Sequence, residues 1–162
     1  MSSEDAGIQS LKKHLRDSVS LLSSMKLYEG AKLSAEALTS MSQEDSDMIS
    51  TDHIPKYKLQ VSKSEQDVFA LAKTYFDCKE FDRCAHVLKN CKSQDVLFIR
   101  LYAMFLSGEK KKEEESEGVL GLHDHSSVNT SVSLILKELE SILEQESNGL
   151  KSPFLNWLHG VV

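Results

Sequence analysis

The sequence predicts an all-α protein built from antiparallel helical hairpins. Apolar residues recur at intervals of three and four along several segments, which is the period of one face of a helix. The 162 residues include only 7 glycines and 2 prolines, so the many tight turns of an all-β protein are disfavoured. A chain of this length is sufficient for one domain with a substantial core, so we treat residues 1–162 as a single domain.

The first predicted hairpin covers residues 8–41. Its first helix carries one continuous apolar stripe, and its second helix begins near Tyr28. The stripe consists of Ile8, Leu11, Leu15, Val19 and Leu22. The face of the second helix consists of Tyr28, Ala31, Ala35 and Leu38. Residues 42–63 are polar and acidic and include Pro55, so we expect a loop there.

Helical periodicity returns over residues 64–108. Ser64 is followed by an acidic residue three positions on, which is the pattern of a helix N-cap. A short turn at residues 77–80 separates two helices, and a third helix opens near Ser93. We expect that helix to end at Gly108, because glycine favours the left-handed conformation that terminates helices.

The rest of the chain is predicted to hold a charged loop and two more helices. Residues 109–127 begin with "EKKKEEESEG", which favours a solvated loop or a frayed helix end. Residues 128–162 hold further helices, the first with an apolar face at Val128, Val132, Ile135, Leu139 and Ile142. The last helix begins at Ser152–Pro153 and has few residues left, so we expect the chain to be a piece of a longer protein.

The Ser152–Pro153 pair has two interpretations. A helix N-cap with proline at the first helical position explains it most simply. A phosphorylation site for a proline-directed kinase is the alternative.

The spacing of large and small residues matches a tetratricopeptide repeat, which is a pair of antiparallel helices in 34 residues. The residues predicted to pack such a repeat are Val68, Leu71, Ala72, Tyr75, Phe81, Cys84 and Leu88. Residues 8–41 fit the same template more loosely. We expect the glycine-free turn at residues 77–80 to be right-handed and polar. Since one repeat cannot bury its apolar face, the repeats are predicted to stack into an α–α superhelix, or solenoid.

Three stretches go beyond the generic repeat. "LAKTYFDCKEFDRCAHVL" at residues 71–88, "LYAMFLSGEKKKEEE" at residues 101–115 and, more weakly, "FLNWLHGVV" at the C-terminus resemble the family of the eighth subunit of the anaphase-promoting complex, or cyclosome. The match is specific over residues 65–118, and the first 60 residues match by helix pattern alone.

This resemblance implies a non-catalytic scaffold subunit of a multisubunit E3 ubiquitin ligase that acts on cell-cycle regulators. The implied partners are other subunits of that complex and a second copy of the chain, because members of the family homodimerise through N-terminal repeats. The apolar stripe of the first helix, Ile8 to Leu22, is then the candidate dimer interface. Packing of that stripe against residues 28–41 of the same chain is the alternative. A peptide-binding adaptor is the second functional hypothesis, for which only Lys73 and Arg100 offer suitable basic groups.

Several other functions are disfavoured by composition. A net charge of −6 without a basic patch argues against nucleic-acid binding. No apolar run approaches the roughly 18 residues of a membrane-spanning helix. Three cysteines without a CxxC motif indicate a reducing compartment, so we expect the nucleus and cytoplasm.

We also expect no cofactor, no metal ion and no catalytic activity. Cys78, Cys84 and Cys91 are spaced poorly for a tetrahedral metal site and are interpreted as small apolar residues. The "HDH" at residues 123–125 favours a solvated loop. His86 has no nucleophile at a known spacing, so we expect it to pack within a helix pair.

Overall fold

The computed structural model describes residues 3–41, 61–118, 128–145 and 152–162, and no β-strand occurs in these four segments. The helices are α1 (Ser3–Ser24), α2 (Tyr28–Ser40), α3 (Gln66–Asp77), α4 (Phe81–Val87), α5 (Gln94–Gly118), α6 (Ser131–Gln145) and α7 (Pro153–Val161), with a 3-10 turn at Lys63–Glu65. The all-α prediction is confirmed, and the helices form the stacked, superhelical arrangement typical of tetratricopeptide repeats.

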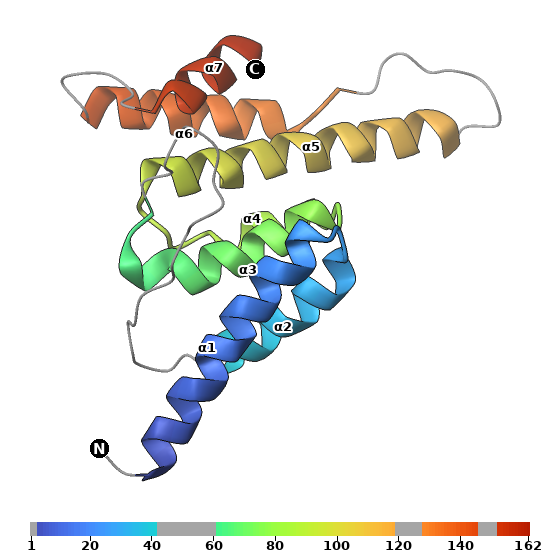
Figure 1. Cartoon of the computed structure of the whole chain (residues 1–162). Coiled ribbons are helices and arrows are strands. Elements are labelled where there is room, and N and C mark those ends of the chain that lie inside the picture. Colours follow the sequence, from blue (N-terminus) through green and yellow to red (C-terminus); the bar gives the residue numbers. More distant parts are fainter. Residues whose placement is uncertain (1–2, 42–60, 119–127, 146–151) are drawn as a thin grey trace.

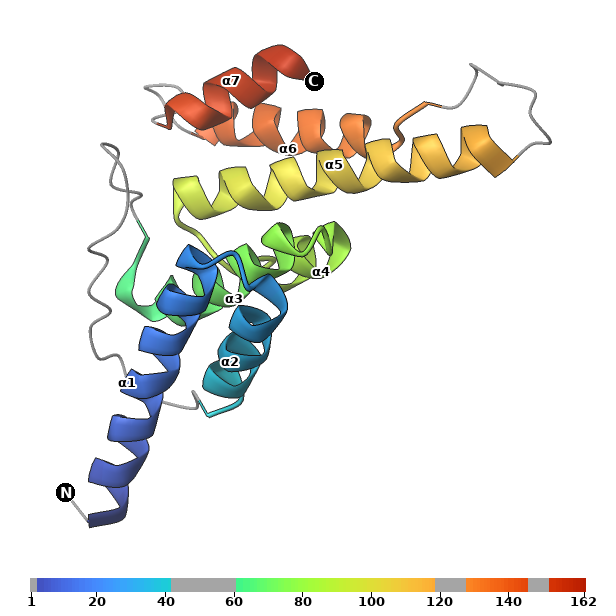
Figure 2. The ribbon, with the colours of Figure 1, turned by 45° about the vertical axis from the view of Figure 1, so that its right-hand side comes forward.

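Successive helices pack on one another in chain order. The pairs α1–α2, α2–α3, α3–α4, α4–α5 and α5–α6 are all in contact, and α7 lies against both α5 and α6. In Figures 1 and 2 the helices α1 to α4 form the lower part of the molecule, and α5 to α7 form the upper part. The N-terminal half of α1 extends past the end of α2 in both views.

The turns after α1 and α3 have the same unexpected backbone geometry. Lys26 and Lys79 both have a φ angle of 60°, in the left-handed region. The amide of Glu80 donates to the carbonyl of Tyr75, and that of Lys79 donates to the carbonyl of Phe76, which is the hydrogen-bond pattern of a Schellman motif. Leu27 and Lys26 make the equivalent bonds to Leu22 and Ser23. The predicted right-handed turn at residues 77–80 is therefore wrong, because a lysine takes the position usually given to glycine.

The apolar core has two parts that meet at α5. The lower cluster consists of Val19, Ala35, Leu71, Ala72, Tyr75, Cys84, Leu88, Val96 and Ala103. The upper cluster consists of Leu101, Ile135, Leu139, Leu155 and Leu158. Because α5 contributes Val96 and Ala103 to one cluster and Leu101 to the other, it is buried on two faces.

Gly108 does not end α5, as the sequence had suggested, and residues 109–118 continue the helix instead of forming a loop. The glycine is buried, and a Cβ at this position would overlap the side-chain amide of Asn129. Asn129 Nδ2 donates 3.0 Å to the carbonyl of Phe105 and 2.9 Å to Glu109 Oε1. Gly108 therefore allows the residues before α6 to approach α5 closely.

Other predicted details also differ from the structure. Val128 is 75 % exposed and precedes α6 instead of lying on its apolar face. Ser64 does not cap α3, because the helix N-cap is Glu65 and no side chain bonds there. The predictions for residues 42–60, 119–127 and 146–151 lie outside the described residues.

Replacing Lys79 with glycine is expected to stabilise the protein. A left-handed residue other than glycine costs about 1–2 kcal/mol, part of which is offset by the greater freedom of glycine in the unfolded chain. We expect Lys79→Gly to raise the free energy of unfolding in urea by about 0.5–1 kcal/mol. The matched control is Lys73→Gly, an exposed position inside α3, which should lower it by about 1 kcal/mol. A loss of stability in Lys79→Gly would contradict this account of the turn.

Replacing Gly108 with alanine should destabilise the contact between α5 and α6. The added methyl group overlaps Asn129, so the expected loss is about 1–3 kcal/mol in thermal or urea unfolding. Gly160→Ala in α7 is the control, because a Cβ there meets nothing within 4 Å. That variant should be neutral or more stable by up to about 1 kcal/mol. Equal effects of the two substitutions would show that Gly108 is not needed for close packing.

Candidate functional site

The residues predicted to pack the repeat lie at the junction of α3, α4 and α5. Leu71, Ala72, Tyr75, Cys84 and Leu88 are buried in the lower cluster. Val68 and Phe81 are half-buried and pack against the same cluster. These side chains therefore hold the helices together and leave little apolar surface free at this junction.

The predicted dimer stripe on α1 divides into a buried and an exposed part. Val19 is 8 % exposed and lies in the lower cluster, while Leu15 and Leu22 are half-buried. Ile8 and Leu11 are 46 % and 49 % exposed. The exposed pair lies in the half of α1 that extends past α2 (Figure 2). Among the described residues, the stripe thus packs within the chain at its C-terminal end and is open at its N-terminal end.

The exposed apolar surface of α1 also includes residues outside the predicted stripe. Leu21 is 60 % exposed and Met25 is 59 % exposed. Leu21 lies about 100° around the helix axis from Leu22 of the predicted stripe, and Met25 follows the last residue of α1. We define the α1 face as Ile8 and Leu11, which lie about one turn apart on the exposed half of the helix.

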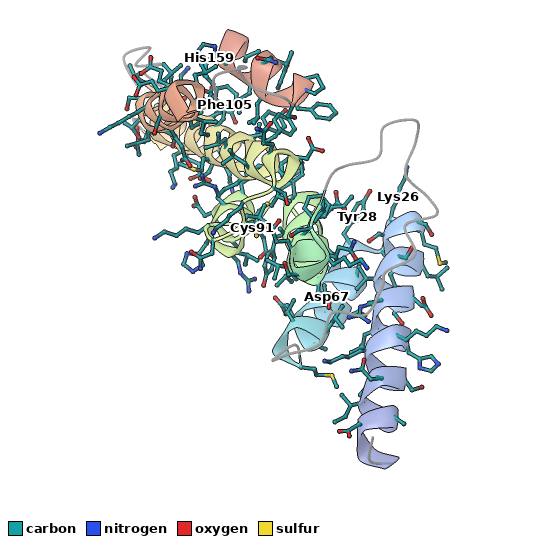
Figure 3. The ribbon with its side chains drawn as sticks, turned by 90° about the vertical axis from the view of Figure 1, so that its left-hand side faces the viewer. Lys26, Tyr28, Asp67, Cys91, Phe105 and His159 are labelled. Atoms are coloured by element: carbon teal, nitrogen blue, oxygen red, sulfur yellow. The ribbon has the colours of Figure 1, made fainter. Side chains whose placement is uncertain are left out.

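A two-pronged ion pair fixes α1 on α3. Arg16 Nε donates to Asp67 Oδ1 at 3.0 Å, and the terminal guanidinium nitrogen donates to Asp67 Oδ2 at 2.9 Å. The two side chains are only 10 % and 16 % exposed. Figure 3 shows Asp67 pointing from its helix towards α1. Because bidentate geometry restricts orientation, this pair helps to set the direction in which α1 projects.

A second polar network joins α2, α3 and α4 around Tyr75. The Tyr75 hydroxyl donates to Glu36 at 2.8 Å and accepts from Arg83 at 3.1 Å, and the guanidinium carbon of Arg83 lies 4.3 Å from the centre of the Tyr75 ring. Arg83 and Lys32 both donate to Glu80, at 2.6 and 2.7 Å. The network therefore satisfies the charged groups of neighbouring hairpins within the chain.

The pKa shifts in this network follow from its contacts. Hydrogen bonding from Lys32 is the main reason that the pKa of Glu80 is lowered. The pKa of Lys32 is raised by hydrogen bonds to Glu29 and then to Glu80. Burial, followed by the hydrogen bond to Glu36, raises the pKa of Tyr75. With these pKa shifts Glu80 stays ionised, Lys32 stays protonated and Tyr75 stays neutral at neutral pH. The network therefore holds the helices together and is not poised for proton transfer.

The three thiols are held in their protonated form. Burial is the first cause of the raised pKa of Cys78, Cys84 and Cys91, and for Cys84 the pKa reaches about 12. A protonated buried thiol is a poor nucleophile and a poor metal ligand. Within the described residues, no group of three histidine, cysteine or acidic side chains is placed to hold a metal ion. The "HDH" at residues 123–125 lies outside these residues.

Two other sequence-based assignments can be compared with the structure. His86 is exposed on α4, so the prediction that it packs between helices is wrong. Lys73 forms an ion pair with Asp77 in its own helix at 2.6 Å, and Arg100 pairs with Glu138 of α6. Both cations considered for peptide binding are therefore paired within the chain. None of the described helices combines the length and the apolar character needed to cross a membrane.

Aromatic rings connect the lower and upper clusters. Phe76 of α3 lies 5.4 Å from Phe81 and 5.9 Å from Tyr102 of α5, measured between ring centres. Tyr102 in turn lies 5.6 Å from Phe98 and 5.8 Å from Trp157 of α7. In Figure 3 the labelled Phe105 and His159 mark the α5–α7 end of the molecule.

Comparison with known proteins gives consistent matches. The family model described as "Anaphase promoting complex subunit 8 / Cdc23" matches residues 10–162. The "Anaphase-promoting complex subunit CDC23" of Saccharomyces cerevisiae is 32 % identical over 136 residues, which cover 73 % of this chain and 22 % of the yeast protein. The "Cell division cycle protein 23 homolog" of Mus musculus is 34 % identical over 157 residues, covering 96 % of this chain and 25 % of the mouse protein.

A plant relative extends the comparison. The "Anaphase-promoting complex subunit 8" of Arabidopsis thaliana is 39 % identical over 99 residues, covering 59 % of this chain and 16 % of that protein. The chain therefore spans a quarter or less of the length of these three relatives.

The raised pKa of Cys84 predicts a specific loss of stability at high pH. The folded state keeps the thiol proton up to about pH 12, whereas the unfolded state releases it near pH 9.0. The contribution of the neutral thiol is therefore fully present below pH 9.0 and is lost as the pH rises towards 12. Relative to Cys84→Ala, the wild-type free energy of unfolding should fall by up to about 1.4 kcal/mol per pH unit in this range. A constant difference between the two proteins in urea titrations from about pH 8 to about pH 11 would contradict the assignment.

Proposed function

The chain belongs to the anaphase-promoting complex subunit 8/Cdc23 family, and from this premise we propose that it is a non-catalytic scaffold segment of an anaphase-promoting complex, a multisubunit E3 ubiquitin ligase. The observation that carries this proposal is that charged and polar side chains of neighbouring hairpins pair with one another. The ion pairs around Arg16 and Tyr75 join neighbouring hairpins, as expected of a framework. The proposed site of action is the nucleus and cytoplasm, with other subunits of the complex as partners.

In this proposal the α1 face binds a second copy of the chain. Ile8 and Leu11 are half exposed on a helix that extends past its neighbour. Neighbouring exposed apolar side chains on one helix face favour burial against a partner. A two-fold contact would bring the same face from each copy together. Arg16 and Asp67 would hold α1 in the orientation that this contact requires.

The alternative function, a peptide-binding adaptor, has less support. Such a module would present free basic or amide groups to the backbone or charges of a peptide. Lys73 and Arg100 are instead paired with Asp77 and Glu138. The half-exposed aromatic rings near Trp157 are the feature that favours this second hypothesis.

The dimer proposal predicts that Leu11→Glu yields a monomer. Leu11 is half exposed, so a carboxylate there should be tolerated by the single chain but not by an apolar interface. We expect light scattering at tens of micromolar protein to give the mass of a monomer for Leu11→Glu and of a dimer for the wild type. The melting temperature extrapolated to low concentration should change little.

Two further variants test whether the effect is specific. Glu114→Lys, on the exposed end of α5, should leave the dimer intact. Leu15→Glu lies at the half-buried part of the stripe and should lower both dimerisation and stability. A dimer that persists in Leu11→Glu, or a wild-type chain that is monomeric at these concentrations, would refute the assignment of the interface to α1.

A further inference from the structure

The hydroxyl of Ser152, the residue that precedes α7, does not cap that helix. Ser152 Oγ donates a 2.9 Å hydrogen bond to Asp95 Oδ1 on α5, and Ser152 N donates a 3.1 Å bond to Gln94 Oε1. Ser152 and Asp95 are each 3 % exposed. This buried pair therefore ties the start of α7 to the first turn of α5.

Apolar contacts also hold α7 on its neighbours. Leu155 and Leu158 are fully buried in the upper cluster, and the ring of Trp157 lies edge-on to Tyr102 at 5.8 Å. The buried Ser152–Asp95 hydrogen bond adds to these apolar contacts between α7 and α5.

A phosphate on Ser152 would reverse the sign of this interaction. It carries about −1.5 to −2 charges at neutral pH and would face the Asp95 carboxylate at the position where the hydroxyl now donates. Like charges in a buried site destabilise the docked arrangement. The same phosphate would be favourable at the N-terminus of α7 itself, because the helix dipole is positive there. Phosphorylation would therefore favour a helix that has left α5.

We propose that Ser152 is a phosphorylation site for a proline-directed serine/threonine kinase, and that the phosphate releases α7 from α5. Ser152 is followed by Pro153 and has φ −81° and ψ 123°, the extended conformation of a kinase substrate. In the transfer, Ser152 Oγ forms a bond to the γ-phosphorus of Mg-ATP. The bond from that phosphorus to the bridging oxygen breaks, ADP leaves, and the hydroxyl proton passes to the base of the kinase.

The docked state hides the hydroxyl, so the kinase acts on the open state. Its rate is then proportional to the fraction of chains in which α7 is detached. This dependence gives a test that does not involve α1, so failure of this proposal and failure of the dimer proposal are distinguishable. Trp157 is the one tryptophan of the chain and lies on α7, so its fluorescence reports detachment directly.

The experiment treats the full chain with Mg-ATP and a purified kinase of the mitogen-activated class. We expect mass spectrometry to find one phosphate on Ser152 of the wild-type chain. The Ser152→Ala variant should carry no phosphate at this position. The emission of Trp157 should shift to the red, and hydrogen exchange should accelerate in α7. Leu158→Ala, which weakens docking, should raise the initial rate severalfold, whereas Leu21→Ala on α1 should not change it.

The charge on Asp95 provides the matched control. In Asp95→Asn the phosphate no longer faces a carboxylate, so phosphorylation should shift the Trp157 emission less than in the wild type. The proposal is overturned if Ser152 receives no phosphate even in Leu158→Ala. It is equally overturned if the phosphorylated wild-type chain keeps the emission and exchange of the unmodified chain.

Discussion

Burial of α5 on two faces is the constraint on which the rest of the structure depends. Val96 and Ala103 join α5 to the lower cluster, and Leu101 joins it to the upper cluster. Most surface helices need one apolar stripe, but a helix between two layers needs two. Without this helix the α1–α4 part and the α6–α7 part have no other shared core among the described residues. The proposed scaffold role rests on the rigidity that such a shared helix provides.

Small side chains and paired charges make the close stacking of the hairpins feasible. Ala31, Ala35, Ala72, Cys84 and Ala103 are fully buried, which lets neighbouring backbones approach. Where polar groups meet at the same junctions, they bond to one another, as Lys32 does to Glu80 and Ser107 does to Asp82 at 2.6 Å. A buried polar group is tolerated when it is satisfied, so these bonds stabilise the register of the stack.

The sequence was sufficient for features that depend on local periodicity. The helix pairs over residues 8–41 and 64–88 and the packing positions from Leu71 to Leu88 follow from intervals of three and four residues. Gly108 could not be interpreted correctly, because the reason for a glycine there is Asn129, which is distant in sequence. The left-handed Lys79 was missed because lysine gives no local signal for that conformation. The exposure of Ile8 and Leu11 depends on where α2 ends relative to α1, which periodicity does not report.

The packing of each helix on the next in chain order has a consequence for synthesis. Since α1 contacts α2, α2 contacts α3, and so on to α5 and α6, most contacts join residues that leave the ribosome within a short interval. Low contact order of this kind favours rapid folding. The hairpin of α1 and α2 can thus reach its final arrangement while α5 to α7 are still being translated.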